Sequence, residues 1–234
     1  MPPPRSPLYR YLAVVRVGVY LEATAKRVFA SAAEWPGWSR SGKDEAAALE
    51  ALTNAGSRYA AVAKRAGLSF KPAAAPDFKV LERLPGSAST DFGVPGAIAR
   101  AEARPLTAAG ADRLEALLRA SWKTFDEVVA KAPAELRKGP RGGGRDRDRI
   151  AGHVLEAEGA YAPRIGVRLK PPAAGDAKAV AEWRDALVAG LRAGPDAADA
   201  AGGGKRWPPA YAARRIAWHA LDHAWEIEDR TPDG

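Results

Sequence analysis

The sequence has no cysteine, a single methionine and only three histidines in 234 residues. The absence of cysteine excludes a disulfide framework, thiolate ligands for a metal and a cysteine nucleophile provided by the chain itself. Thiol chemistry would therefore require a small-molecule thiol. Because only three histidines are present, the position of each one is informative about function.

Long apolar runs are absent as well. The longest run near the beginning covers residues 12–15 and stops at Arg16, which is far shorter than an export signal or a membrane-spanning helix. We therefore expect a cytoplasmic protein that does not enter the membrane. Hydrophobic residues still make up 47% of the chain and seven tryptophans are present, which is enough to bury a core and excludes disorder throughout.

Acidic residues are outnumbered by basic ones, 28 to 36, and the formal net charge is +8. A basic balance can indicate nucleic-acid binding, but neither half of the chain has the long basic stripe of a dedicated binder. The loop at residues 137–149 has spaced arginines and glycines, yet Asp146 and Asp148 neutralise part of it and no aromatic residue is interleaved. We therefore do not expect nucleic acid as a partner.

The pattern of the chain changes near residue 105, from strand-like alternation with one helix to purely helical periodicity. The stretch before this point is rich in residues that break regular structure. These residues are Gly86, Ser87, Ser89, Gly93, Pro95 and Gly96. We predict a small α+β domain at residues 1–84, a linker at 85–106 and an all-α domain at 107–234.

In the first domain, Val15, Val17, Val19 and Leu21 alternate with other residues and predict a half-buried strand. A second strand is expected at 27–32, a long alanine-rich helix at 46–66 and a further strand at 78–81. Ser41 and Asp44 have the spacing of a capping box before the helix.

Three short segments carry a likeness to a known fold. They are residues 28–33, the turn Trp35-Pro36-Gly37-Trp38, and Ser41-Gly42-Lys43-Asp44-Glu45-Ala46. In these segments residues 15–66 resemble the HicB-like antitoxin fold, which implies a role in binding a partner protein. The alternative is a small module for packing or dimerisation, because the exposed edge of a strand hairpin favours pairing with a second copy. We expect a homodimer.

The second domain has four helical patterns. Thr107 precedes the first, which ends at Pro133, and the second carries Ile150 to Tyr161. The third begins near Asp176, and Pro208 with Pro209 suits the first turn of the last. Helices of this length bury their apolar stripes best against one another. The predicted fold is an α+β module followed by an all-α four-helix bundle.

All three histidines fall on the apolar stripes of these helices. His153 lies on the second helix, and His219 and His223 lie one turn apart on the last. A buried imidazole without a partner costs about 1–3 kcal/mol, and a shared divalent metal would serve all three rings. The alternative is two surface histidines and one satisfied core histidine.

The sequence around these histidines resembles that of a known family. The segments are Ile150-Ala151-Gly152-His153-Val154-Leu155-Glu156 and Trp218-His219-Ala220-Leu221-Asp222-His223-Ala224-Trp225-Glu226. Together with the helix order over residues 107–230, they resemble the DinB/YfiT-like metalloenzyme family. The resemblance implies a three-histidine site for Zn or Ni and kinship with bacterial thiol-dependent S-transferases and isomerases. The alanine- and arginine-rich composition suggests a high-GC genome, and therefore mycothiol as the thiol.

Two carboxylates lie three residues after a histidine and are candidate catalytic groups: Glu156 after His153, and Glu226 after His223. Either could orient a ligand imidazole or act as a general base. For both Glu156 and Glu226 the alternative is a solvated surface carboxylate, which is also the role we expect for Asp222.

Two arginines and three aromatic residues lie near the histidines in the sequence. Arg214 and Arg215 precede His219 by about one turn and are candidates to bind a carboxylate at the mouth of the site, or else are solvated. Tyr161, Trp218 and Trp225 are interpreted as packing residues.

The sequence thus predicts a metal-dependent transferase or hydrolase that acts on a small-molecule substrate and uses a low-molecular-weight thiol. The alternative is a non-catalytic interaction module with a HicB-like N-terminal domain.

Overall fold

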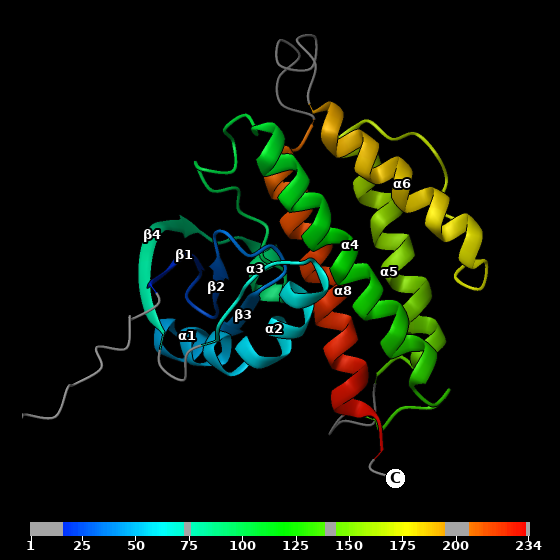
Figure 1. Ribbon diagram of the computed structural model, residues 1–234. Coiled ribbons are helices and arrows are strands. Elements are labelled where there is room, and N and C mark those ends of the chain that lie inside the picture. The colour runs from blue at the N-terminus through cyan, green and yellow to red at the C-terminus, as the bar shows by residue number, and fades with distance from the viewer. Residues whose placement is uncertain (1–15, 73–75, 139–143, 195–205, 233–234) are drawn as a thin grey trace, which may run out of the picture.

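A computed structural model of the chain describes residues 16–72, 76–138, 144–194 and 206–232. The apolar run at 12–15, Val15 of the predicted first strand and the centre of the arginine–glycine loop lie outside these residues. A small mixed sheet with short helices comes first and long helices follow (Figure 1). The predicted α+β class is confirmed. None of the helices within the described ranges is long and apolar enough to cross a lipid bilayer.

The sheet has four strands in the order β3-β2-β1-β4. β1 pairs antiparallel with β2, with Val19 opposite Ala32, and β4 runs parallel to β1 on its other side. Val17, Val19 and Leu21 of the predicted first strand are buried, but Tyr20 and Glu22 are buried too, so the strand is covered on both faces and is not half-buried as predicted. The strands are β1 (Arg16–Ala23), β2 (Val28–Ala32), β3 (Ser39–Gly42) and β4 (Asp77–Pro85).

Strand β3 corrects two expectations from the sequence. Ser41 belongs to β3 and not to a capping box, and Asp44 alone caps the next helix by accepting a 2.8 Å hydrogen bond from the amide of Ala47. The predicted hairpin of β1 and β2 also has no free edge, because β3 pairs with the outer side of β2 and β4 pairs with the outer side of β1. Pairing through that hairpin edge is therefore blocked within the chain.

The predicted long helix at 46–66 is two helices, α1 (Glu45–Asn54) and α2 (Gly56–Arg65). The chain turns at Ala55, between asparagine and glycine, which are poor helix formers. A Cβ on Gly56 would lie 3.3 Å from Pro72 and 3.7 Å from the Trp38 ring. The missing side chain thus relieves a tight contact with Pro72, while the distance to Trp38 is an ordinary van der Waals contact.

That core is a cluster of rings between the sheet and the two helices. Trp38 stacks on Tyr59 with ring centroids 5.8 Å apart, and Phe70 meets Trp38 edge-on at 4.9 Å. Both polar tips are satisfied inside the core: Trp38 Nε1 donates to the Leu52 carbonyl and the Tyr59 hydroxyl donates to the Pro36 carbonyl, each at 2.8 Å. The turn predicted at residues 35–38 is therefore fixed from both sides.

The predicted linker at 85–106 contains a short helix, α3 (Ala88–Phe92), and is bound closely to the sheet. The buried carboxylate of Glu22 on β1 accepts hydrogen bonds from the Thr90 hydroxyl and from the amides of Gly96 (3.1 Å) and Ala97 (2.8 Å). We call residues 85–106 the connecting segment.

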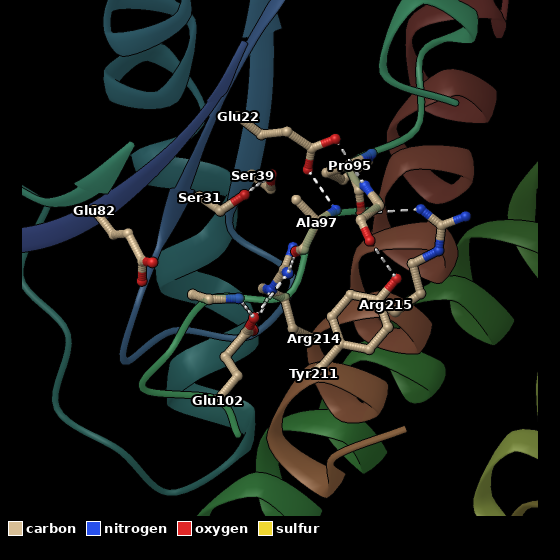
Figure 2. Close-up of polar contacts among 12 residues, drawn as sticks. Glu22, Ser31, Ser39, Glu82, Pro95, Ala97, Glu102, Tyr211, Arg214 and Arg215 are labelled. Atoms are coloured by element: carbon tan, nitrogen blue, oxygen red, sulfur yellow. Dashed lines mark hydrogen bonds and ion pairs between the residues drawn. The ribbon is translucent and has the colours of Figure 1, made fainter. Parts of the chain in front are cut away.

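The connecting segment is also held from its other side by the last helix, as Figure 2 shows. Arg214 forms a buried ion pair with Glu102 and donates to the Ala97 carbonyl at 2.8 Å. Arg215 donates to the Pro95 carbonyl at 3.1 Å, and the Tyr211 hydroxyl donates to the Gly96 carbonyl at 2.9 Å. The segment is therefore a fixed layer between the sheet and the helices.

The helices predicted after residue 107 are present. Thr107 caps the first by accepting from the Gly110 amide at 3.1 Å, and Asp176 caps the third through the Ala179 amide at 3.0 Å. A short 3₁₀ helix follows the second where Pro163 was expected to end it. The elements are α4 (Ala108–Lys131), α5 (Arg147–Tyr161), η1 (Ala162–Ile165), α6 (Ala177–Ala193) and α8 (Pro209–Arg230).

Helix α8 lies between the two parts of the molecule, beside α4, with the sheet domain on one side and α5 and α6 on the other (Figure 1). Every residue from Tyr211 to Leu221 is buried. Trp218 meets Phe29 of β2 edge-on with centroids 6.1 Å apart, and Arg40 of β3 lies 4.1 Å above the Trp225 ring. The two tryptophans are packing residues, as expected.

Helices α4, α5 and α6 are joined by one buried carboxylate that sequence reasoning did not single out. Glu158 on α5 is 1% exposed. Its two oxygens accept hydrogen bonds from Trp122 Nε1 of α4 at 2.8 Å and Trp183 Nε1 of α6 at 3.0 Å. Arg184 lies 3.8 Å away and pairs with Asp126 at 2.7 Å.

We expect Phe29→Ala to destabilise the protein by about 3–5 kcal/mol, because it leaves a cavity between the sheet and α8. Phe92→Ala is the matched control: Phe92 is 88% exposed, and its loss should change stability by less than about 0.5 kcal/mol. Urea unfolding followed by tryptophan fluorescence measures both. Equal effects of the two substitutions would contradict the packing described for Phe29.

Burial raises the pKa of Glu158 above its ordinary value. In the unfolded chain, Glu158 ionises at its ordinary pKa. Between that value and the raised pKa of the folded state, unfolding releases a proton from Glu158, so rising pH favours the unfolded state. We expect the stability of the wild type relative to Glu158→Gln to fall as the pH rises from about 4 towards neutrality. Urea unfolding of both proteins across this range measures the difference, and a pH-independent difference would contradict the expectation.

Candidate metal centre

The three histidines of the chain meet at one point between α5 and α8. The ring centroids of His219 and His223 are 4.6 Å apart, and His153 lies 5.1 Å from each. One ligand nitrogen from each ring can be chosen so that all three lie within 4.8 Å of one another. Nitrogens that share one tetrahedral zinc ion at about 2.0–2.1 Å lie about 3.3–3.4 Å apart, so the three rings have to move closer together to share one ion.

Helix geometry brings these side chains together. His219 and His223 are four residues apart on α8 and project from the same face. His153 is in the middle of α5, which packs against α8. The expectation that the histidines lie on the facing stripes of two helices is confirmed.

The environment favours the neutral form of His153 and His219. Burial lowers the pKa of His219 well below its ordinary value, and the neighbouring His223 and His153 add to this effect. Burial, with Arg145 nearby, also lowers the pKa of His153. A neutral imidazole has a free lone pair, so these rings can bind a metal without first releasing a proton.

His219 has an unmet requirement that a ligand could satisfy. The residue is 7% exposed and its Nδ1 is buried without a hydrogen-bond partner. A buried polar atom left unpaired costs about 1–3 kcal/mol. His219 also belongs to the cluster of three histidines, which offers the nitrogen ligands that zinc and nickel accept.

His223 is oriented by a carboxylate. Its Nδ1 lies 2.7 Å from Glu226 Oε2, and Arg230 holds the other oxygen of Glu226 at 2.7 Å. The hydrogen bond to His223 lowers the pKa of Glu226, so the carboxylate is ionised and accepts the Nδ1 proton. The lone pair of His223 is then on Nε2, as in the carboxylate–histidine pairs that support metal ligands.

The structure separates the two carboxylates predicted near the site. Glu226 contacts His223 directly, whereas Glu156 is exposed on α5. Asp222, expected to face water, is part-exposed and forms an ion pair with Arg40 at 2.9 Å. Tyr161 lies beside the site, its ring centroid 6.2 Å from that of His219.

The two arginines that were candidates to bind a carboxylate, Arg214 and Arg215, are both buried, and they contact different neighbours. Arg214 is turned to the connecting segment, where Glu102 occupies its guanidinium. Arg215 is buried between the rings of Tyr161 and Trp218, at 5.4 and 5.2 Å from their centroids. Only Arg215 therefore lies against the histidine cluster.

Sequence reasoning missed Arg230, although it lies four residues after Glu226, a spacing that favours an acid–base pair on a helix. Sequence spacing also indicated that Glu158 is buried, because it follows the buried Val154 by four residues on the same face of the helix. Glu102 carried no local signal, since its partner is 112 residues away.

Comparison with known proteins gives no family: no family model, curated protein or solved structure matches the chain. The interpretation of the site therefore rests on its own residues.

We expect Glu226→Ala to weaken metal binding about 10- to 100-fold, because His223 loses the acceptor that fixes its tautomer and orientation. Glu156→Ala is the matched control, since Glu156 also follows a histidine by three residues but is exposed; its metal affinity should equal that of the wild type. Competition titration with a chromophoric zinc chelator measures both. Equal affinity of Glu226→Ala and the wild type would show that the carboxylate does not support the ligand.

Proposed function

We propose that the protein is a divalent-metal-dependent transferase or hydrolase that acts on a small-molecule substrate. The observation that carries the proposal is the convergence of His153, His219 and His223, with ligand atoms within 4.8 Å of one another. Three neutral imidazoles leave further coordination positions for water or substrate, which is typical of catalytic and not of structural sites.

We also propose that α4, α5, α6 and α8 form a DinB-like four-helix bundle. Helix α8 contacts each of the other three, and α4 contacts α5. The buried Glu158 adds a polar connection among α4, α5 and α6. The histidine positions on the second and last of these helices are those of the DinB/YfiT-like pattern.

In this proposal the histidines hold zinc or nickel, and Glu226 and Arg230 act as positioning residues. A bound divalent cation of this kind lowers the pKa of coordinated water or stabilises a coordinated thiolate. Glu226 is already engaged by His223 and Arg230 on its two oxygens. Glu156, exposed one turn after His153, is therefore assigned the transfer of protons to and from solvent.

A low-molecular-weight thiol such as mycothiol is the proposed co-substrate. The chain has no cysteine of its own, and a three-histidine centre can receive a thiolate from outside. Such a reaction belongs in the cytoplasm, where small thiols are kept reduced.

The first test is the metal content of the protein purified without a tag or chelator. We expect about one zinc or nickel per chain by elemental analysis, because three ligands on two packed helices form a preorganised site. His153→Ala should lose the metal while keeping its fold, since His153 is only part-buried. Protein that contains no metal and binds none on addition of zinc or nickel would leave the interaction module as the function.

A further inference from the structure

Arg215 lies on the same face of α8 as the two histidine ligands. Residues 215, 219 and 223 are spaced by four, so they form one stripe along the helix. At 1.5 Å per residue, Arg215 is about 6 Å along the axis from His219. On α5, Tyr161 follows His153 by eight residues and lies opposite Arg215. The two stripes therefore face each other beyond the histidines.

Arg215 is a buried cation without an acidic partner. It is 9% exposed, and no carboxylate within the described ranges lies within 4.0 Å of its guanidinium. One nitrogen, Nη1, donates to the Pro95 carbonyl, as Figure 2 shows, and Nε is buried with no hydrogen-bond partner. Its neighbour Arg214 is equally buried but has Glu102. A buried charge is costly unless it is paired, so Arg215 lacks an anion.

The surroundings of Arg215 connect it to the metal centre. Its guanidinium lies 5.4 Å from the Tyr161 ring centroid and 5.2 Å from that of Trp218. The same two rings lie 6.2 and 5.9 Å from the ring of His219. The rings of Tyr161 and Trp218 therefore each lie near both the Arg215 guanidinium and the His219 imidazole.

The charge of the site also favours an anion. The imidazoles are neutral when they bind a metal, and Glu226 is balanced by Arg230. A divalent ion and Arg215 would together place three positive charges near one another, with Arg145 adding to the field at His219. A negatively charged ligand would offset this repulsion.

We infer that Arg215 forms a carboxylate-binding subsite of the metal centre. Since Nη1 is engaged by Pro95, the remaining edge formed by Nε and Nη2 presents two parallel donors, which match the two oxygens of a carboxylate. The substrate or thiol is therefore a small carboxylic acid whose second polar group reaches the histidines past the Tyr161 ring, which lies near both Arg215 and His219. This inference rests on the proposed function, since it needs a ligand at the histidines.

The test uses the full chain loaded with cobalt(II), whose visible spectrum reports both metal binding and thiolate coordination. The probes are 4-mercaptobutyrate, which carries a carboxylate, and 1-propanethiol, which does not. We expect 4-mercaptobutyrate to bind the wild type at least about 10-fold more tightly, the usual contribution of a charge-assisted hydrogen bond.

Arg215→Met keeps an apolar chain between the two rings and should reduce this preference to about one. Arg215→Lys keeps the charge without the two-donor edge and should retain only about a threefold preference. Arg168→Met is the matched control for the loss of one positive charge, because Arg168 is exposed; it should keep the full preference. If Arg215→Met does not fold, the preference of Arg215→Lys for 4-mercaptobutyrate, compared with that of the wild type, tests the inference.

The outcomes separate the two proposals. Failure of cobalt to bind the wild type overturns the proposed function. Cobalt binding with equal affinities for the two thiols overturns the carboxylate subsite alone, as does a preference that Arg215→Lys leaves at the wild-type level. Displacement of 4-mercaptobutyrate by inorganic phosphate at lower concentration than by acetate would assign the edge to phosphate and also overturn the inference.

Discussion

The burial of α8 on all sides from Tyr211 to Leu221 is the constraint on which the rest of the structure depends. One face packs on the sheet through Trp218 and Trp225, and another presents His219 and His223 to α5. A helix enclosed in this way cannot rotate about its axis without breaking contacts on several sides. The geometry of the histidine cluster is therefore set as much by the sheet as by the neighbouring helices.

Buried carboxylates organise the contacts around this helix. Glu22 holds the connecting segment from the sheet side, and Glu102 ties it to α8 through Arg214. Glu158 joins three helices by accepting hydrogen bonds from the indole N–H groups of Trp122 and Trp183. Each carboxylate has several donors, which offset part of the cost of desolvation, although for Glu158 burial outweighs them and raises its pKa. Arg215 differs from these groups because its charge has no such counterpart in the described parts of the chain.

The sequence was most informative where structure depends on local spacing. Thr107, Asp176 and the prolines at 208–209 indicated where helices begin, and the four-residue spacing of His219 and His223 placed them on one face. Strand β3 was missed because it is four residues long and forms only by pairing with β2. The partner of Arg214 was missed because Glu102 is distant in sequence, and no periodicity encodes such a pairing.

The connecting segment has a consequence for how the molecule unfolds. It is bonded to β1 through Glu22 and to α8 through Arg214 and Arg215, so neither half can separate without stripping polar groups from the other. We therefore expect the two parts to unfold together. A fragment consisting of the helices alone would expose the tryptophan face of α8 to water, so the sheet is the apolar cover of the helix that bears the histidines.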